Sequence, residues 1–125
     1  MIGHFVFYII DLKMKNTLLL VTREGMGDAP HELQTVLIMN FFRALLKENK
    51  IPETIFFYAD GIKLNLRGSV IEDSLIELEN RGTSIITCTT CLNFFEVLPV
   101  LASGTKGGMP DLIRLIGSSD KVITL

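Results

Sequence analysis

Cys88 and Cys91 are the residues of this chain best suited to covalent chemistry, and they are its only cysteines. They form a Cys-x-x-Cys pair within the segment TSIITCTTCLNFF, residues 83–95. An apolar, β-compatible run precedes the pair and a helix-like run follows it, which predicts a strand-to-helix junction. Free N–H groups at a helix start stabilise a thiolate and lower its pKa. We therefore expect Cys91, nearer the predicted helix start, to be the reactive thiol and Cys88 its resolving or supporting partner.

A thiolate at such a junction can attack a sulfane sulfur and become a persulfide, or it can attack a disulfide. An intrachain structural zinc site is disfavoured, because it needs four ligands and only His4 and His31 could complete the set. A thioredoxin-type fold is disfavoured as well, since its cysteine pair normally follows an early strand and an aromatic residue. Two inert core cysteines are the remaining alternative.

A glycine-bearing stretch near the carboxyl end is a second candidate feature. Its residues are Gly104, Lys106, Gly107 and Gly108. They could form an anion-binding loop close to the thiols, or they could form a flexible turn. Gly25 and Gly27 follow the first predicted strand, but Pro30 stands where a dinucleotide-binding motif needs its third glycine. His31 could act as a base, although its place at a helix start favours a solvated surface residue.

Composition limits the classes of function. A chain of 125 residues predicts one domain, and an apolar fraction of 48% can fill its core and leave surface for an oligomer interface. The net charge of −2 provides no basic face, which argues against nucleic acid as a partner. Two cysteines and no evident secretory signal favour the cytoplasm, and the apolar runs are too short to span a membrane. No metal or cofactor is expected.

Predicted strands and helices alternate along the chain from residue 17 onward, and these elements must position the cysteines. Residues 1–16 are expected to be an amino-terminal extension or an extra edge strand, and residues 17–125 the domain. Apolar runs predict strands at 17–22, 54–59, 83–87 and 121–125, with a short extended piece at 62–66. One helix is predicted at 31–49, with Leu33, Leu37, Phe41 and Leu45 as its buried stripe. A second helix should follow the capping box of Ser69 and Glu72. Two more are predicted at 92–98, before Pro99, and at 110–116.

This alternation predicts right-handed βαβ connections and a mainly parallel sheet with helices on both faces. Residues 102–110 are expected to form a loop. Reactive groups in such sheets lie beyond the carboxyl ends of the strands, where Cys88 and Cys91 fall.

Several segments, in order, resemble the DsrE/DsrF-like family, and most closely its YedF-type proteins, a sulfurtransferase-like group linked to selenium metabolism. TCTTCLNFF resembles that group's C-G-T-C-L-N-F/Y segment, and GTKGGMPDL resembles its G-x-x-S-N-M-x-D-I loop. MGDAPHEL and FFYADGIKLNLRGSVIEDSLIELENRG resemble the first βα loop and the middle of the domain. The resemblance covers nearly the whole chain after residue 16.

The resemblance implies a three-layer α/β/α sandwich around a five-stranded, mostly parallel sheet. It also implies a homo-oligomer (dimer, trimer or hexamer) and a sulfurtransferase-like role in sulfur relay, with the family's cysteine pair at Cys88 and Cys91. Thr89 replaces the glycine after the first cysteine. The TusA-like domain common in YedF-type proteins is lacking, so a TusA-like carrier or a cysteine desulfurase would act in trans.

A persulfide carrier is the leading hypothesis from the sequence. A dithiol–disulfide oxidoreductase and a non-catalytic oligomeric assembly or binding module remain as alternatives.

Overall fold

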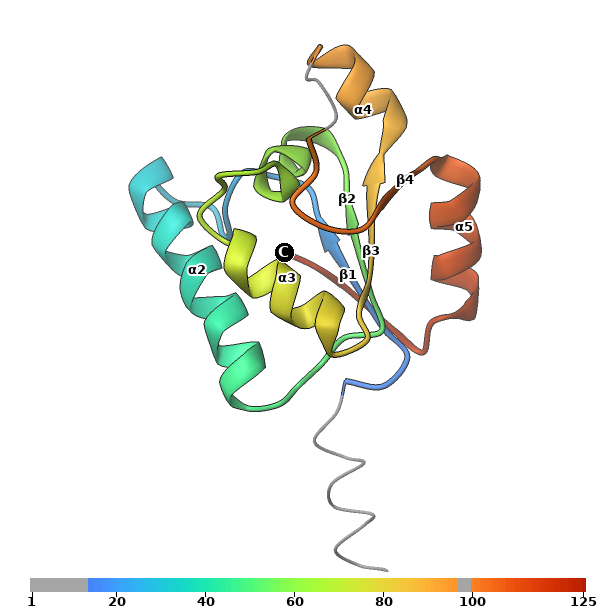
Figure 1. Cartoon of the computed structure of the whole chain (residues 1–125), viewed down its shortest axis with the longest axis horizontal. Helices are drawn as coiled ribbons and strands as arrows, with labels where there is room; N and C mark the ends of the chain where they lie inside the picture. Colours follow the sequence, from blue (N-terminus) through green and yellow to red (C-terminus); the bar gives the residue numbers. More distant parts are fainter. Residues whose placement is uncertain (1–13, 97–99) are drawn as a thin grey trace, which may run out of the picture.

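The computed structural model describes residues 14–96 and 100–125 of the chain (Figure 1). Its elements are β1 (Thr17–Val21), α2 (His31–Lys47), β2 (Thr54–Phe57), the 3-10 helix η1 (Ala59–Asn65), α3 (Glu72–Asn80), β3 (Ser84–Cys88), α4 (Thr89–Phe94), β4 (Thr105–Gly107), α5 (Met109–Ser118) and β5 (Lys121–Thr124). The strands form one sheet in the order β4-β3-β2-β1-β5, and every neighbouring pair is parallel. The predicted five-stranded sheet is confirmed, and it is parallel throughout rather than mostly so.

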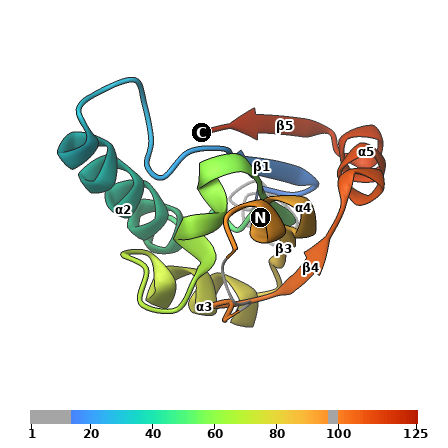
Figure 2. The same cartoon turned by 90° about the horizontal axis from the view of Figure 1, so that it is seen from above.

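The central strands β1 and β2 are buried along their whole length, as their uninterrupted apolar sequences require. Leu19 and Val21 join the apolar cluster formed with α2, α3 and η1, whereas Leu18 and Leu20 join a second cluster with Leu112 of α5. Figure 2 shows α2 and α3 on one side of the sheet and α5 on the other. The three-layer arrangement predicted for the fold is therefore confirmed.

The buried stripe of α2 differs from the prediction. Ile38, Phe42 and Leu45 face the core, while Leu33 and Leu37 are exposed. Both sets have helical spacing, and α2 is apolar over much of its circumference, so periodicity alone did not identify the inward face.

The junctions around the cysteines also differ from the prediction. Residues 62–65 are not extended, because the chain turns directly out of β2 into η1, and only Leu66 is extended, in an antiparallel bridge with Leu101. Strand β3 runs through Cys88, and α4 begins at Thr89 rather than after Cys91, so Cys88 is the residue that caps α4. The predicted end of this helix near Pro99 lies outside the described residues, as do residues 1–13 of the proposed extension.

Part of the expected loop 102–110 is a strand. Residues Thr105–Gly107 form β4 at the sheet edge, with Gly107 opposite Cys88 in the parallel register. Three residues are too few to show a strand pattern in the sequence. Helix α5 is longer than predicted and contains Gly117, and its start is stabilised by the N–H of Gly108 donating to the Asp111 carboxylate at 2.8 Å.

The capping box predicted before α3 forms only in part. Ser69 Oγ accepts the N–H of Ile71 at 3.2 Å, but the Glu72 carboxylate accepts the N–H of Gly68 instead of that of Ser69. The helix consequently begins at Glu72.

Candidate functional site

The structure brings Cys88 and Cys91 together at the carboxyl end of β3, where the chain turns into α4 (Figure 1). Cys88 is fully buried and belongs to the same apolar cluster as Phe56 and Leu112. Cys91, the third residue of α4, is partly buried and packs against both clusters. Both are free thiols. Cys91 is therefore the thiol that a reactant can reach from solvent.

A backbone N–H from another element points at the Cys91 sulfur. Ala59, the first residue of η1, donates its N–H to Cys91 Sγ at 3.2 Å. Ala59 adopts a left-handed conformation with φ of 53°, which is unusual for a residue with a side chain. The donor that we expected from the helix after the cysteines thus comes from the turn after β2.

The turn that presents this N–H is tightly constrained. Tyr58 donates its N–H to the carbonyl of Val21 at 3.0 Å, and Gly61 donates to the carbonyl of Tyr58 at 3.1 Å. A Cβ on Gly61 would lie 2.0 Å from the Val21 carbonyl oxygen, so only glycine fits against β1 here. The missing side chain of Gly61 allows η1 to start immediately after β2.

Burial raises the pKa of the Cys91 thiol above its ordinary value. The hydrogen bond from the Ala59 N–H lowers the pKa, while a hydrogen bond and charge interaction with Cys88 raise it further. The expected lowering of the Cys91 pKa is therefore wrong in its direction, because a single N–H donor does not offset the loss of water around the sulfur.

A second contact joins η1 to α4 one helical turn further along. Lys63 Nζ lies 4.6 Å from the centroid of the Phe95 ring, a cation–π contact, and is 3.0 Å from the Asp60 carboxylate. The hydrogen bond that the Lys63 ammonium donates to the Asp60 carboxylate is the main cause that raises the pKa of Lys63. Ala59 and Lys63 of η1 thus contact Cys91 of α4 and Phe95, the residue that follows α4.

The structure places the four residues proposed as an anion loop along β4 and at its two ends. Gly107 lies opposite Cys88 and its carbonyl accepts the Thr89 hydroxyl at 3.2 Å, whereas Gly104 lies at the other end of β4. The N–H groups of Gly104 and Gly108 donate to the carboxylates of Glu79 and Asp111, both at 2.8 Å. Lys106 is exposed. The anion-binding role of this loop stays a prediction, with two of its amides already occupied.

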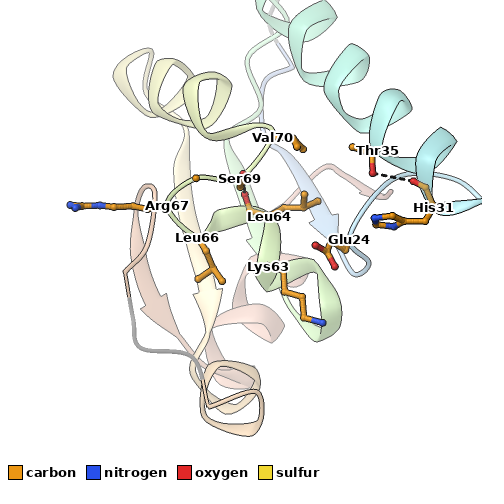
Figure 3. Close-up of a pocket in the computed structure, with 10 residues that line it drawn as sticks. Glu24, His31, Thr35, Lys63, Leu64, Leu66, Arg67, Ser69 and Val70 are labelled. Carbon is orange, nitrogen blue, oxygen red and sulfur yellow. Dashed lines mark hydrogen bonds between the residues drawn. The ribbon is translucent and has the colours of Figure 1, made fainter.

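A pocket of about 470 Å³ opens near the carboxyl ends of β1 and β2 (Figure 3). Its walls come from the segment after β1, the first turns of α2, η1 and the segment before α3. Charged and polar lining residues are Glu24, His31, Thr35, Lys63, Arg67 and Ser69. His31, considered from the sequence as a base or a surface residue, is exposed and lines this pocket.

Ala59 was not identified from the sequence, and among the pocket residues only His31 was considered as a functional group. The dipeptide Asp60-Gly61 is typical of a turn, but nothing local in the sequence shows that the N–H of Ala59 would reach a sulfur 32 residues further along. In the part of the chain that the structure describes, no three His, Cys, Asp or Glu side chains gather as a metal site would require. None of the described helices is long and apolar enough to cross a membrane.

The fold and the site define a small α/β protein with a thiol pair at the carboxyl edge of a parallel sheet. The model of the DsrE/DsrF-like family matches residues 18–125, and the chain belongs to this family, which is associated with sulfur relay. No curated protein matches the chain.

Similar solved structures include those of YchN and MTH1491. The YchN protein of E. coli is 21% identical, with a TM-score of 0.60, over 87% of this chain and 98% of that one. MTH1491 of Methanobacterium thermoautotrophicum, a protein of unknown function, is 17% identical, with a TM-score of 0.64, over 87% of this chain and 97% of that one. At these identities the likeness shows a shared fold.

Proposed function

We propose that this protein is a sulfur carrier that holds a persulfide on Cys91. The observation that carries the proposal is the Cys91 sulfur itself, which is partly exposed, accepts the Ala59 N–H and lies beside a second thiol. Membership of a family associated with sulfur relay supports the same chemistry.

Loading would begin when Cys91 loses its proton to water. The Cys91 thiolate attacks the outer sulfur of a donor persulfide, R–S–SH. A new S–S bond forms on Cys91 as the donor's S–S bond breaks, and the electron pair leaves with the donor thiolate, R–S⁻. The Ala59 N–H supports the negative charge on Cys91 before the attack, because a thiolate is a better hydrogen-bond acceptor than a thiol.

Cys88 offers a route for release. Its thiolate can attack the inner sulfur of the Cys91 persulfide, which forms a Cys88–Cys91 disulfide and expels HS⁻. The two thiols supply the two electrons that reduce the sulfane sulfur, and an external thiol then reduces the disulfide. Transfer to an acceptor thiolate instead leaves Cys88 unchanged, so Cys88 supports the carrier without being required for loading.

Intact-mass spectrometry after incubation with a cysteine desulfurase and cysteine tests the proposal. Wild type and Cys88→Ser should each gain the mass of one sulfur atom, and a reductant should remove it. Cys91→Ser should gain none. Wild type that gains no sulfur, or Cys91→Ser that gains as much as wild type, would reject the carrier.

A dithiol–disulfide oxidoreductase is the second candidate. Cys88 is the residue before α4 and Cys91 is three residues further, and Cys88 is close enough to raise the pKa of the Cys91 thiol, so a bridge between neighbouring thiols is considered. Thiol counting across a glutathione redox series distinguishes the two functions. A bridge that forms at a physiological potential supports the oxidoreductase, and thiols that stay reduced at an oxidising potential exclude it.

The finer family assignment belongs to the same proposal. Likeness to YedF-type segments supports a link to selenium metabolism, in which the atom carried would be selenium rather than sulfur. We also propose a cytoplasmic homo-oligomer served in trans by a cysteine desulfurase or a TusA-like carrier. If the double variant Cys88→Ala/Cys91→Ala retained the cellular role, a non-catalytic assembly module would replace the carrier.

A further inference from the structure

We infer that the pocket between η1 and the amino end of α2 binds a small organic cation, a primary amine or guanidinium attached to an apolar body. The pocket lies beyond the carboxyl ends of β1 and β2, the edge at which parallel α/β sheets bind ligands (Figure 3). Its volume of about 470 Å³ suits a small molecule. The inference goes beyond the sulfur carrier and needs neither thiol.

The charge balance of the pocket favours a cation. Lys63 and Arg67 are the positive residues on its wall, and the Lys63 ammonium is already 3.0 Å from the carboxylate of Asp60, which does not itself line the pocket. Glu24 adds a second carboxylate, so two negative groups share one ammonium. The guanidinium of Arg67 extends away from the other labelled residues in Figure 3 and leaves its side-chain stem at the rim. The amino end of α2 is positive, but Glu32 in its first turn offsets that charge.

Two polar side chains on one side of the pocket are available to a ligand. Figure 3 shows Glu24 and His31 on the same side, both directed toward the middle of the pocket. Within residues 14–96 and 100–125, neither the Glu24 carboxylate nor the His31 ring has a hydrogen-bond partner, and the Glu24 charge interacts with the Lys63 ammonium. The hydroxyl groups of Thr35 and Ser69, by contrast, donate to backbone carbonyls at 3.0 and 2.6 Å. An ammonium can donate to the Glu24 carboxylate and to an unprotonated nitrogen of His31.

Apolar side chains form the rest of the surface. Leu64 is buried in the floor, Leu66 is partly buried, and Val70 is exposed at the opposite rim from Lys63. These groups would contact the apolar body of the ligand once its cationic end faces Glu24. A small anion of similar shape would place its charge against the same carboxylate and should be rejected.

Tyramine and 4-hydroxyphenylacetate are matched probes, since they share an aromatic body and carry opposite charges. Titration of each into the ¹⁵N-labelled full chain, followed by the amide signals of Gly68 and Val70, measures binding. Tyramine should shift these signals saturably with a Kd in about the millimolar range, and 4-hydroxyphenylacetate should not. Glu24→Gln, which removes the charge and keeps the shape, should weaken tyramine binding about three- to fivefold.

Glu48→Gln is the matched control, because Glu48 is an exposed carboxylate at the far end of α2 that does not line the pocket. It should leave the Kd of tyramine unchanged. The inference is overturned if the two probes bind equally, if neither shifts the signals, if the acid binds better, or if Glu24→Gln has no more effect than Glu48→Gln. Cys91→Ser should bind tyramine as wild type does, so failure of the sulfur carrier and failure of this site are separately visible.

Discussion

Cys91 is subject to two opposing effects at the scale of single residues. Packing against both apolar clusters removes water from its sulfur and favours the neutral thiol. The Ala59 N–H at 3.2 Å favours the thiolate. Burial prevails, so the structure describes a thiol that is held in place for reaction but ionises only in small part at neutral pH.

The pH dependence of Cys91 alkylation tests this balance. In Cys88→Ser, which isolates Cys91, the rate of reaction with iodoacetamide should rise about tenfold for each pH unit and level off above the ordinary pKa of a cysteine. The sign follows from the raised pKa, because only the thiolate reacts and its fraction grows until the pH passes the pKa. A rate that levels off below pH 8 would show an activated thiol and contradict the raised pKa of Cys91.

Gly61→Ala should disturb the Cys91 sulfur from a distance. Its new Cβ would lie 2.0 Å from the Val21 carbonyl oxygen, so the turn must shift and carry the Ala59 N–H away. The pKa of Cys91 should rise further, and alkylation at a fixed pH below that pKa should slow by about tenfold.

Gly25→Ala is the control for Gly61→Ala. It creates a similar clash, 2.5 Å from Gln34 Cβ, in the loop before α2, and should lower stability without slowing alkylation of Cys91. Equal alkylation rates in folded Gly61→Ala and wild type would show that the turn does not hold the donor.

A buried polar cluster fixes η1 at the scale of secondary-structure elements. Asn65 Nδ2 donates to Thr87 Oγ1 and to the carbonyl of Ser103, both at 2.9 Å, and Ser103 Oγ donates to Asn65 Oδ1 at 2.9 Å. The cluster ties the end of η1 to β3, one residue before Cys88, and to the segment that leads into β4. It therefore positions the element whose first N–H reaches Cys91.

Asn65→Ala should lower the free energy of unfolding by about 2–4 kcal/mol, because it leaves buried partners without a hydrogen bond. Urea denaturation measures this change. Asn40→Ala, at an exposed position of α2, should change stability by no more than about 0.5 kcal/mol. A loss in Asn65→Ala no larger than in the control would contradict the role of the cluster.

The elements also show how far sequence reasoning reaches. The apolar runs of β1 and β2 predicted strands, because burial on both faces leaves no polar alternation. The cysteine pair could be recognised because Cys88 and Cys91 lie three residues apart, so their proximity does not depend on tertiary contacts. The 3-10 helix η1 and the strand β4 were missed, since each depends on a tertiary contact: Gly61 against Val21, and Gly107 in register with Cys88.

At the scale of the whole molecule, the two faces of the sheet are covered unequally. Helices α2 and α3 cover one face, and α5 lies on the other (Figure 2). Helix α5 exposes Ile113 to 69% and Ile116 to 45%, apolar surface that a monomer gains nothing by presenting to water. The proposed homo-oligomer would bury it.

Ile113→Asp should shift the protein toward smaller species in analytical ultracentrifugation, because a carboxylate at a buried interface is costly. Asn40→Asp adds the same charge at an exposed polar position of α2 and should leave the distribution unchanged. A wild type that is monomeric at micromolar concentration, or an Ile113→Asp variant that assembles normally, would show that α5 is not the interface.

The most direct test of the central claim locates the transferred sulfur. After loading by a cysteine desulfurase, persulfides can be trapped with an alkylating agent and the tryptic peptides read by tandem mass spectrometry. We predict that the additional sulfur lies on Cys91 in wild type and in Cys88→Ser. Sulfur found on Cys88 instead, or on neither cysteine, would contradict the assignment of Cys91 as the carrier.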